Sequence, residues 1–152
     1  MFFDKKITLF NLEACDRQDA LRQMVNSLRA ENLVAASFEQ GILEREESFP
    51  TGLAVKPFGV AIPHTDADKV ICPQIAFASL KNPVKFLVMG NNAQEEIDVS
   101  LIFMLALKNP ADQLTMLQRL MEILQDQILL TEFSECKNKN EFDDLLNRIG
   151  LK

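Results

Sequence analysis

Apolar residues recur along this chain at two spacings, and the two spacings alternate. In one set of segments they lie three or four residues apart, which is typical of a helix with one buried face. In the other set they form short runs, which are typical of buried strands. The predicted helices cover residues 17–31, 38–49, 110–126, 127–137 and 141–148, and the predicted strands cover residues 7–10, 59–62, 74–80 and 99–107. Residues 52–58 are expected to be extended, 82–86 to form a turn that starts a further strand, and 90–98 to form a polar connection.

This alternation predicts an α/β fold, at the border with α+β. We expect one mixed sheet of about five strands, sandwiched between helices, in a single domain over residues 1–152. The run Val99–Leu107 is apolar on both faces, as expected of a central strand with helices on each side.

Capping residues mark where the helices should begin and end. Asp16, Ser37 and Asn109 can each accept a hydrogen bond from a free N–H group in the first turn that follows. Pro50 should end the second helix, and Gly150 should end the last. The late helix, residues 110–126, is expected to bury an apolar stripe of Leu114, Leu117, Leu120, Met121 and Leu124.

Charge and composition exclude several classes of function. The net charge is −6, so phosphate backbones would be repelled and nucleic acid is not an expected partner, whereas a basic protein is. The chain shows neither a signal-peptide pattern nor an apolar run of transmembrane length, so we expect a cytoplasmic protein. Cys15, Cys72 and Cys136 lack metal-site spacing and are predicted to be buried, reduced thiols.

The chain contains a single histidine, His64, at the end of the predicted strand in "GVAIPH". An imidazole at the carboxyl end of a strand can act as a base, a metal ligand or a nucleophile. A metal site is disfavoured because no second histidine exists, and the chain lacks "GxSxG", P-loop and dinucleotide-binding motifs, so no cofactor or metal is predicted. From these residues alone, a histidine that merely closes the strand is the slightly favoured alternative.

The stretches "LEREESFPTG" and "GVAIPH" resemble the enzyme IIA domains of the bacterial phosphoenolpyruvate-dependent sugar phosphotransferase system. The resemblance is to the mannitol/fructose type, and is closest to its galactitol-type subgroup, to which "FPTG" and "KNPADQL" are also similar. In that family an arginine in an "RE" step precedes a histidine in an "AIPH" step, and these residues are Arg45 and His64 here. Mannitol and fructose types carry a second histidine where this chain has Gln113. Many members of the family have a very small residue directly after the histidine, where this chain has Thr65.

The resemblance implies a phosphocarrier function for the chain. His64 would accept a phosphoryl group from the basic phosphocarrier protein HPr and pass it to the cognate enzyme IIB, indirectly serving the membrane permease, enzyme IIC. Arg45, Gln113 and free N–H groups after Asn109 would hold the phosphoryl oxygens. The sugar would be bound by the membrane component, so the sequence does not identify it.

Alternatives remain open from the sequence. The whole chain could be a regulatory module of the nitrogen-related type, which would use phosphorylation to control protein binding. Arg45 could pair with Glu44, Glu46 or Glu47 at the surface. Asp66 and Asp68 are predicted to be loop acids, and an exposed apolar rim is expected around His64 because two partners must dock there.

Overall fold

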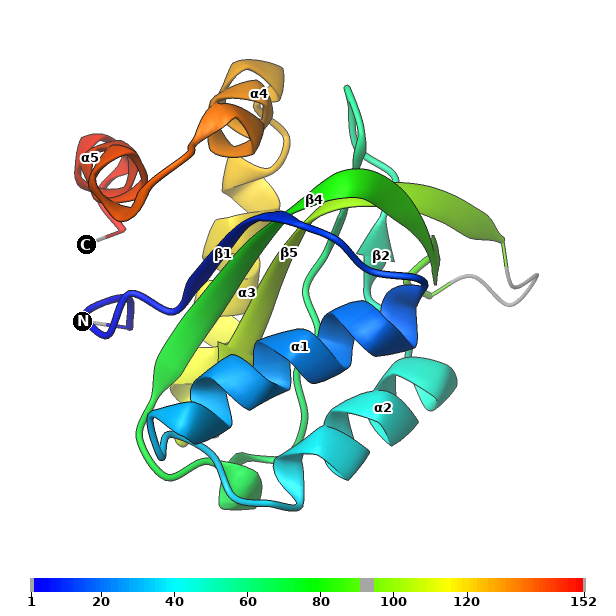
Figure 1. Ribbon diagram of the computed structural model, residues 1–152, viewed down its shortest axis with the longest axis vertical. Coiled ribbons are helices and arrows are strands. Elements are labelled where there is room, and N and C mark those ends of the chain that lie inside the picture. Colours follow the sequence, from blue (N-terminus) through cyan, green and yellow to red (C-terminus); the bar gives the residue numbers. More distant parts are fainter. Residues whose placement is uncertain (1, 91–94, 152) are drawn as a thin grey trace.

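A five-stranded mixed sheet forms the centre of the molecule in the computed structural model, which describes residues 2–90 and 95–151 (Figure 1). The strands are β1 (Thr8–Leu12), β2 (Gly52–Leu53), β3 (Gly59–Ala61), β4 (Gln74–Leu87) and β5 (Glu96–Ala106). Their order in the sheet is β1-β4-β5-β3-β2. The pairs β1–β4 and β3–β5 are parallel, and the pairs β4–β5 and β2–β3 are antiparallel. The predicted mixed sheet of about five strands is confirmed.

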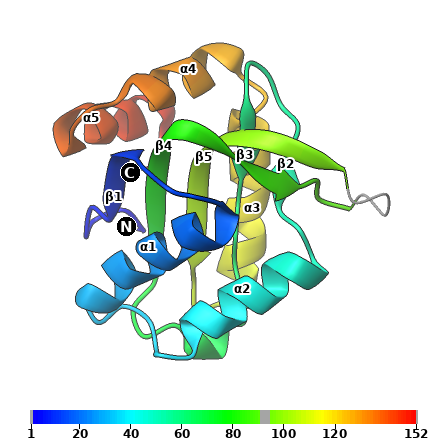
Figure 2. The same cartoon turned by 45° about the vertical axis from the view of Figure 1, so that its right-hand side comes forward.

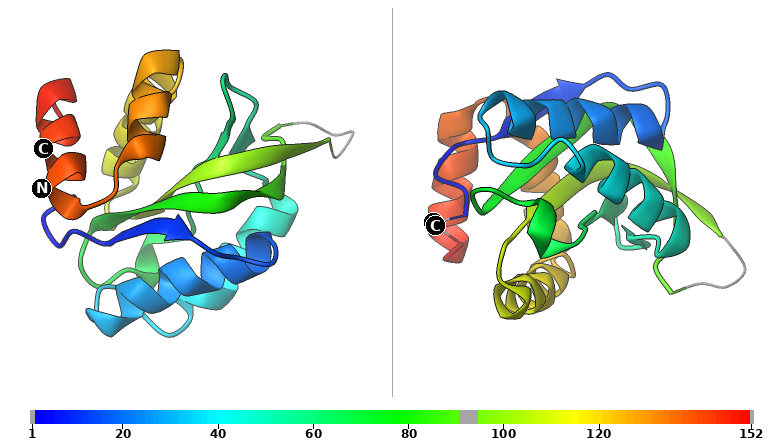
Figure 3. Two further views of the ribbon diagram at one scale, coloured as in Figure 1. Left: turned by 45° about the horizontal axis from the view of Figure 1, so that its top comes forward. Right: turned by 90° about the horizontal axis from the view of Figure 1, so that it is seen from below.

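Helices cover both faces of this sheet, as Figures 2 and 3 show. The helices are α1 (Arg17–Ala30), α2 (Phe38–Ser48), α3 (Pro110–Ile123), α4 (Gln127–Glu135) and α5 (Lys139–Ile149). Helices α1 and α2 lie on one face, and α3, α4 and α5 lie on the other. A short 3-10 helix, Ala67–Lys69, follows β3. Each layer of helices encloses its own hydrophobic core against the sheet.

The central strand β5 shows why the sheet needs two covered faces. Alternate side chains enter opposite cores: Ile102 and Met104 pack towards α1 and α2, whereas Leu101, Phe103 and Leu105 pack on the other side. All five are buried. An apolar run on both faces is what a strand between two helical layers requires, so the prediction of a central strand is confirmed.

Strand β4 is longer than the sequence pattern predicts. It continues through Asn82 and Pro83, where a turn was expected. The register against β5 shifts between Ser79 and Val84, so the extra residues form a bulge. A bulge leaves a backbone position without a ladder hydrogen bond, which is the position that a proline tolerates. The predicted polar connection at 90–98 lies partly outside the described residues, and its last part belongs to β5, which begins at Glu96.

Two of the three predicted N-caps are made by side chains. Asp16 accepts a hydrogen bond from the N–H of Asp19, and Asn109 accepts one from the N–H of Ala111. The prediction for Ser37 was wrong, because this residue has helical backbone angles and its side chain makes no capping bond. Gly150 ends α5 in the left-handed conformation, with φ of 76°, which glycine adopts without strain.

The cysteines and the late helix depart from the predicted burial. Cys136 is buried, but Cys72 is only half-buried and Cys15 is exposed. In α3 the stripe is buried only towards its C-terminal end, at Leu120 and at Leu124 just beyond it, because that part of the helix packs on the sheet. No helix in the described part of the chain is long and apolar enough to cross a membrane.

Candidate functional site

His64 lies beyond the carboxyl end of β3, beside the central strand. Two residues, Ile62 and Pro63, separate it from the last residue of β3. The carbonyl oxygen of Pro63 accepts a hydrogen bond from the N–H of Leu105 at 2.9 Å, and His64 forms a parallel bridge with Leu105. Because β3 and β5 are parallel, their carboxyl ends meet at this edge, where α/β proteins commonly bind ligands.

The backbone fixes the protonation pattern of the His64 ring. Nδ1 lies 3.0 Å from the carbonyl oxygen of Ile62. A carbonyl oxygen can only accept, so in the neutral ring Nδ1 carries the proton and Nε2 keeps its lone pair. Burial lowers the pKa of His64 below its usual 6.5, the bond to Ile62 opposes that effect, and the charge of Arg45 adds to it. At neutral pH the half-buried ring is therefore mainly a neutral imidazole, with the free lone pair on Nε2.

Arg45 lies in the last turn of α2 and acts electrostatically on His64. Its Nη1 lies 3.7 Å from Oδ1 of Asp66, and its Cζ lies 4.9 Å from the centre of the Phe49 ring. Within residues 2–90 and 95–151, Arg45 forms no ion pair with its sequence neighbours Glu44, Glu46 and Glu47. Asp66 is highly exposed, so this ion pair is solvated and weak, and the guanidinium can exchange it for another anion.

A small hollow adjoins these residues, with a volume of about 210 Å³. It is lined by Gly41, Glu44, Arg45, Ser48, Phe49, Thr65, Asp66 and Lys69. The close approach of α2 to the segment after His64 depends on Gly41. A Cβ atom at this position would lie 2.8 Å from the hydroxyl oxygen of Thr65, which is buried. The absence of a side chain at Gly41 thus allows α2 to pack directly beside the His64 segment.

Gln113 lies in the first turn of α3, which begins shortly after β5 ends. The side chain is half-buried, and its Oε1 atom is buried without a hydrogen-bond partner among the residues that the structure describes. In that part of the chain no hydrogen bond joins Gln113 to His64 or Arg45. Two backbone N–H groups of this turn already make hydrogen bonds within the helix. The N–H of Ala111 donates to the side chain of Asn109, and the N–H of Gln113 donates to the backbone carbonyl of Asn109. Fewer free N–H groups are therefore available than the sequence predicted.

Apolar side chains are exposed near these residues. Phe49, which stacks on Arg45, is 64% exposed, and Leu114, next to Gln113, is 58% exposed. Leu114 was expected in the buried stripe of α3, so that prediction was wrong. An exposed phenyl ring and an exposed leucine next to the candidate residues provide an apolar rim of the kind that a docking protein covers.

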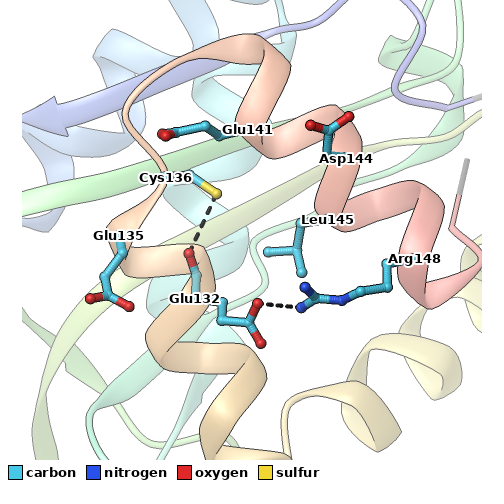
Figure 4. Close-up of a pocket in the computed structure, with 7 residues that line it drawn as sticks. All are labelled: Glu132, Glu135, Cys136, Glu141, Asp144, Leu145 and Arg148. Atoms are coloured by element: carbon cyan, nitrogen blue, oxygen red, sulfur yellow. Dashed lines mark hydrogen bonds and ion pairs between the residues drawn. The ribbon is translucent and has the colours of Figure 1, made fainter.

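A second hollow, of about 450 Å³, lies between α4 and α5 (Figure 4). Its lining includes four carboxylates, at Glu132, Glu135, Glu141 and Asp144, together with Cys136. Burial raises the pKa of the Cys136 thiol to about 11, and its S–H donates to the carbonyl oxygen of Glu132. The thiol is thus protonated and unreactive at neutral pH. Within the described ranges, no group of three His, Cys, Asp or Glu side chains could hold a metal ion.

Sequence reasoning missed one pair of residues beside the site. Glu46, which follows Arg45, is buried and accepts two hydrogen bonds from Thr51. In the sequence Glu46 is one of several acids in "LEREES", and nothing in that pattern distinguishes it from its exposed neighbours. Only the five-residue spacing between Glu46 and Thr51, across a turn with Pro50, could have suggested a contact.

Comparison with known proteins gives one family. Residues 1–149 match the family described as "Phosphoenolpyruvate-dependent sugar phosphotransferase system, EIIA 2". The galactitol-specific EIIA component of Escherichia coli (strain K12) is 31% identical over 110 residues, which cover 72% of each chain.

Solved structures of the same system share the fold. A putative IIA protein (PtxA) of Streptococcus mutans aligns with a TM-score of 0.80 and 18% identity, covering 97% of this chain and 91% of its own. The complex of mannitol enzyme IIA with phosphorylated enzyme IIB from Escherichia coli aligns with a TM-score of 0.73 and 20% identity, over 93% of this chain and 94% of that one.

Proposed function

Because the chain belongs to the EIIA 2 family of the phosphoenolpyruvate-dependent sugar phosphotransferase system, we propose that it is a phosphocarrier whose His64 is phosphorylated transiently. One observation carries this proposal: the bond from Nδ1 to the Ile62 carbonyl, which leaves Nε2 of a neutral ring as a nucleophile near Arg45. HPr is the proposed donor and the cognate enzyme IIB the proposed acceptor.

In the first transfer, the Nε2 lone pair attacks the phosphorus atom, and the bond that joins the phosphoryl group to HPr breaks. The proton on Nδ1 stays in place, donated to the Ile62 carbonyl. In the second transfer, the nucleophile of enzyme IIB attacks the same phosphorus, and the N–P bond returns its electron pair to Nε2. Arg45 compensates the charge on the phosphoryl oxygens, which is the main task of a protein in phosphoryl transfer.

The sugar-specific relative supports transport of a sugar or polyol, with a galactitol-like substrate for the complete system. Its name favours this function over a regulatory role of the nitrogen type. The proposed partner enzyme IIB is supported by the likeness to the mannitol IIA–IIB complex. The sugar itself would be bound by the membrane component, enzyme IIC, and these transfers would take place in the cytoplasm.

Reconstitution of the relay tests the proposal. Purified protein is incubated with phosphoenolpyruvate, enzyme I and HPr, and intact mass and acid lability of the product are measured. We expect one acid-labile phosphate per chain, and its loss when a galactitol-type enzyme IIB is added. If the protein takes up phosphate but transfers none to enzyme IIB proteins, the regulatory alternative is favoured. If it takes up no phosphate, the phosphocarrier function is refuted.

The transfer rate should fall as the pH is lowered from 8 to acidic values, with a midpoint below pH 6.5. Burial, together with the charge of Arg45, holds the pKa of His64 below 6.5, so the neutral, reactive ring predominates at neutral pH. Below pH 6.5 an unfolded chain binds a proton at this position before the folded protein does, so the free energy of unfolding also decreases there. Arg45→Gln should move the midpoint to higher pH, because it removes a positive charge. A profile centred at or above pH 6.5 in the wild type would contradict this interpretation.

Gln113 substitutions test whether α3 contributes to the site. If its amide holds a phosphoryl oxygen, Gln113→Ala should slow transfer about tenfold, which corresponds to roughly 1.5 kcal/mol for one hydrogen bond to a charged group. Gln113→Glu should be slower still, because it places a carboxylate near an incoming anion. Gln113→His should restore transfer and add a pH dependence. Equal rates for the glutamate variant and the wild type would exclude Gln113 from the phosphoryl site.

A further inference from the structure

A buried carboxylate connects the two segments that carry Arg45 and His64. Glu46 is 4% exposed. Its Oε2 accepts a hydrogen bond from the N–H of Thr51, and its Oε1 accepts one from the hydroxyl of Thr51, both at 2.7 Å. Thr51 directly precedes β2, and Glu46 lies in the last turn of α2. These two bonds, the Glu46–Thr51 clamp, therefore attach the end of α2 to the beginning of β2.

Backbone hydrogen bonds continue from the clamp to the imidazole. The carbonyl oxygen of Thr51 accepts from the N–H of Ile62 at 3.3 Å. The carbonyl oxygen of Ile62 faces Nδ1 of His64 at 3.0 Å. Thr51 uses its N–H towards Glu46 and its C=O towards Ile62, and these groups belong to different peptide units. We therefore expect Glu46 to affect His64 by fixing the positions of Thr51 and Ile62, and not by polarising a single amide group between them.

We propose that Glu46 is a positioning residue for the phosphoryl site. By fixing Thr51 it places the Ile62 carbonyl, which keeps the proton of His64 on Nδ1 and leaves Nε2 free. By holding the last turn of α2 it also keeps Arg45 towards the same site. The inference deepens the proposed function, since the benefit of this arrangement lies in the reactivity of Nε2.

Fold stability alone does not account for a carboxylate at this place. Burial raises the pKa of Glu46 above its usual value, although the two bonds from Thr51 oppose this shift. The ionised group is thus less stable here than in water, and a buried charge of this kind is a poor source of stability. Its oxygens nevertheless match the two donors of Thr51 one to one, which gives the turn a unique geometry.

Glu46→Gln removes this match at nearly constant volume, because an amide offers one acceptor oxygen in place of two. In wild-type protein, ¹⁵N NMR of His64 should show a neutral ring protonated at Nδ1 only. In Glu46→Gln we expect a mixture of both tautomers, a pKa closer to 6.5, and phosphoryl transfer at least tenfold slower. Thr51→Val should have a similar effect, because valine lacks the hydroxyl that donates to Glu46. Thr51→Ser keeps that hydroxyl and should behave like the wild type.

A matched control separates positioning from general loss of stability. Asp143 in α5 is also a buried acid, 9% exposed, and pairs with Lys6 at 3.0 Å on the opposite side of the sheet. Asp143→Asn should lower the melting temperature but leave the His64 tautomer, its pKa and the transfer rate unchanged.

The inference is overturned if His64 keeps one tautomer and its pKa in Glu46→Gln, or if Asp143→Asn changes them to the same extent. If Glu46→Gln does not fold, the comparison of Thr51→Val with Thr51→Ser decides. The NMR result does not depend on phosphorylation. If the wild type takes up no phosphate, the proposed function is refuted. The tautomer of His64 in the variants would still test whether the Glu46–Thr51 clamp positions the ring.

Discussion

His64→Ala will take up no phosphate from phosphorylated HPr under conditions in which the wild type is fully modified. The chain contains no second histidine, and the thiol of Cys136, which lines a hollow, is protonated at neutral pH. Neither water nor a neighbouring side chain can take the place of the His64 imidazole as the group that carries the phosphate. The loss of phosphate incorporation should therefore be complete rather than partial. Intact mass spectrometry after incubation with phosphoenolpyruvate, enzyme I and HPr measures it.

His64→Asn is the matched variant for this experiment. Its amide nitrogen is as many bonds from the backbone as Nδ1, so it can still donate to the Ile62 carbonyl, which the imidazole binds at 3.0 Å in the wild type. We expect it to be as inactive as the alanine variant, with a melting temperature close to that of the wild type. Phosphate uptake by either variant would show that another residue carries the group.

Arg45→Lys should slow phosphoryl transfer by about 10- to 100-fold, which is less than the roughly 100- to 1000-fold cost of removing an anion-stabilising donor outright, because lysine keeps the charge. Lysine keeps the positive charge but loses the planar guanidinium, which can bind two phosphoryl oxygens at once and which lies over the Phe49 ring here. The pKa of His64 should remain below 6.5, because burial, its main cause, is unaltered and lysine retains the positive charge. Rapid-quench measurement of the rate, together with a pH titration of His64 by NMR, separates the two effects.

Arg22→Lys provides the control for that comparison. Arg22 lies in α1 with an exposed side chain, so the same chemical change there should leave the transfer rate unaltered. The melting temperature of Arg45→Lys should change little, because the ion pair of Arg45 with Asp66 is solvated and worth at most about 1 kcal/mol. If Arg45→Lys transfers phosphate as fast as the wild type, Arg45 is a surface residue without a role in the transfer.

The helices of this fold could be predicted from sequence because their signals are local. Asp16, Asn109 and Gly150 each act within one turn of the helix that they begin or end. The length of β4 could not be predicted, since Asn82 and Pro83 indicate a turn locally. Only pairing with β5, and the bulge between Ser79 and Val84, makes the extended conformation favourable. Such tertiary pairing overrides local propensity.

For the site, the sequence predicted the residue types but not their contacts. His64 and Arg45 were identified from short motifs, and the structure supports their proximity through the effect of Arg45 on the imidazole. The acceptor for Nδ1 could not be predicted, because it depends on how the chain turns between Ile62 and His64. The stacking of Arg45 on Phe49 and the burial of Glu46 depend on where α2 ends and how β2 begins. These contacts form only in the folded chain, so they could not be predicted from the sequence.

The central claim is that Nε2 of His64 carries the phosphoryl group, and NMR of ¹⁵N-labelled protein tests it most directly. The protein is phosphorylated through phosphoenolpyruvate, enzyme I and HPr, and the two ring nitrogens of the single histidine are followed by their couplings to phosphorus and to ring protons. The structure predicts a phosphorus coupling at Nε2, with Nδ1 still protonated and bound to the Ile62 carbonyl. Phosphorus bound to Nδ1, or a ring unchanged while phosphate is incorporated elsewhere, would contradict the account.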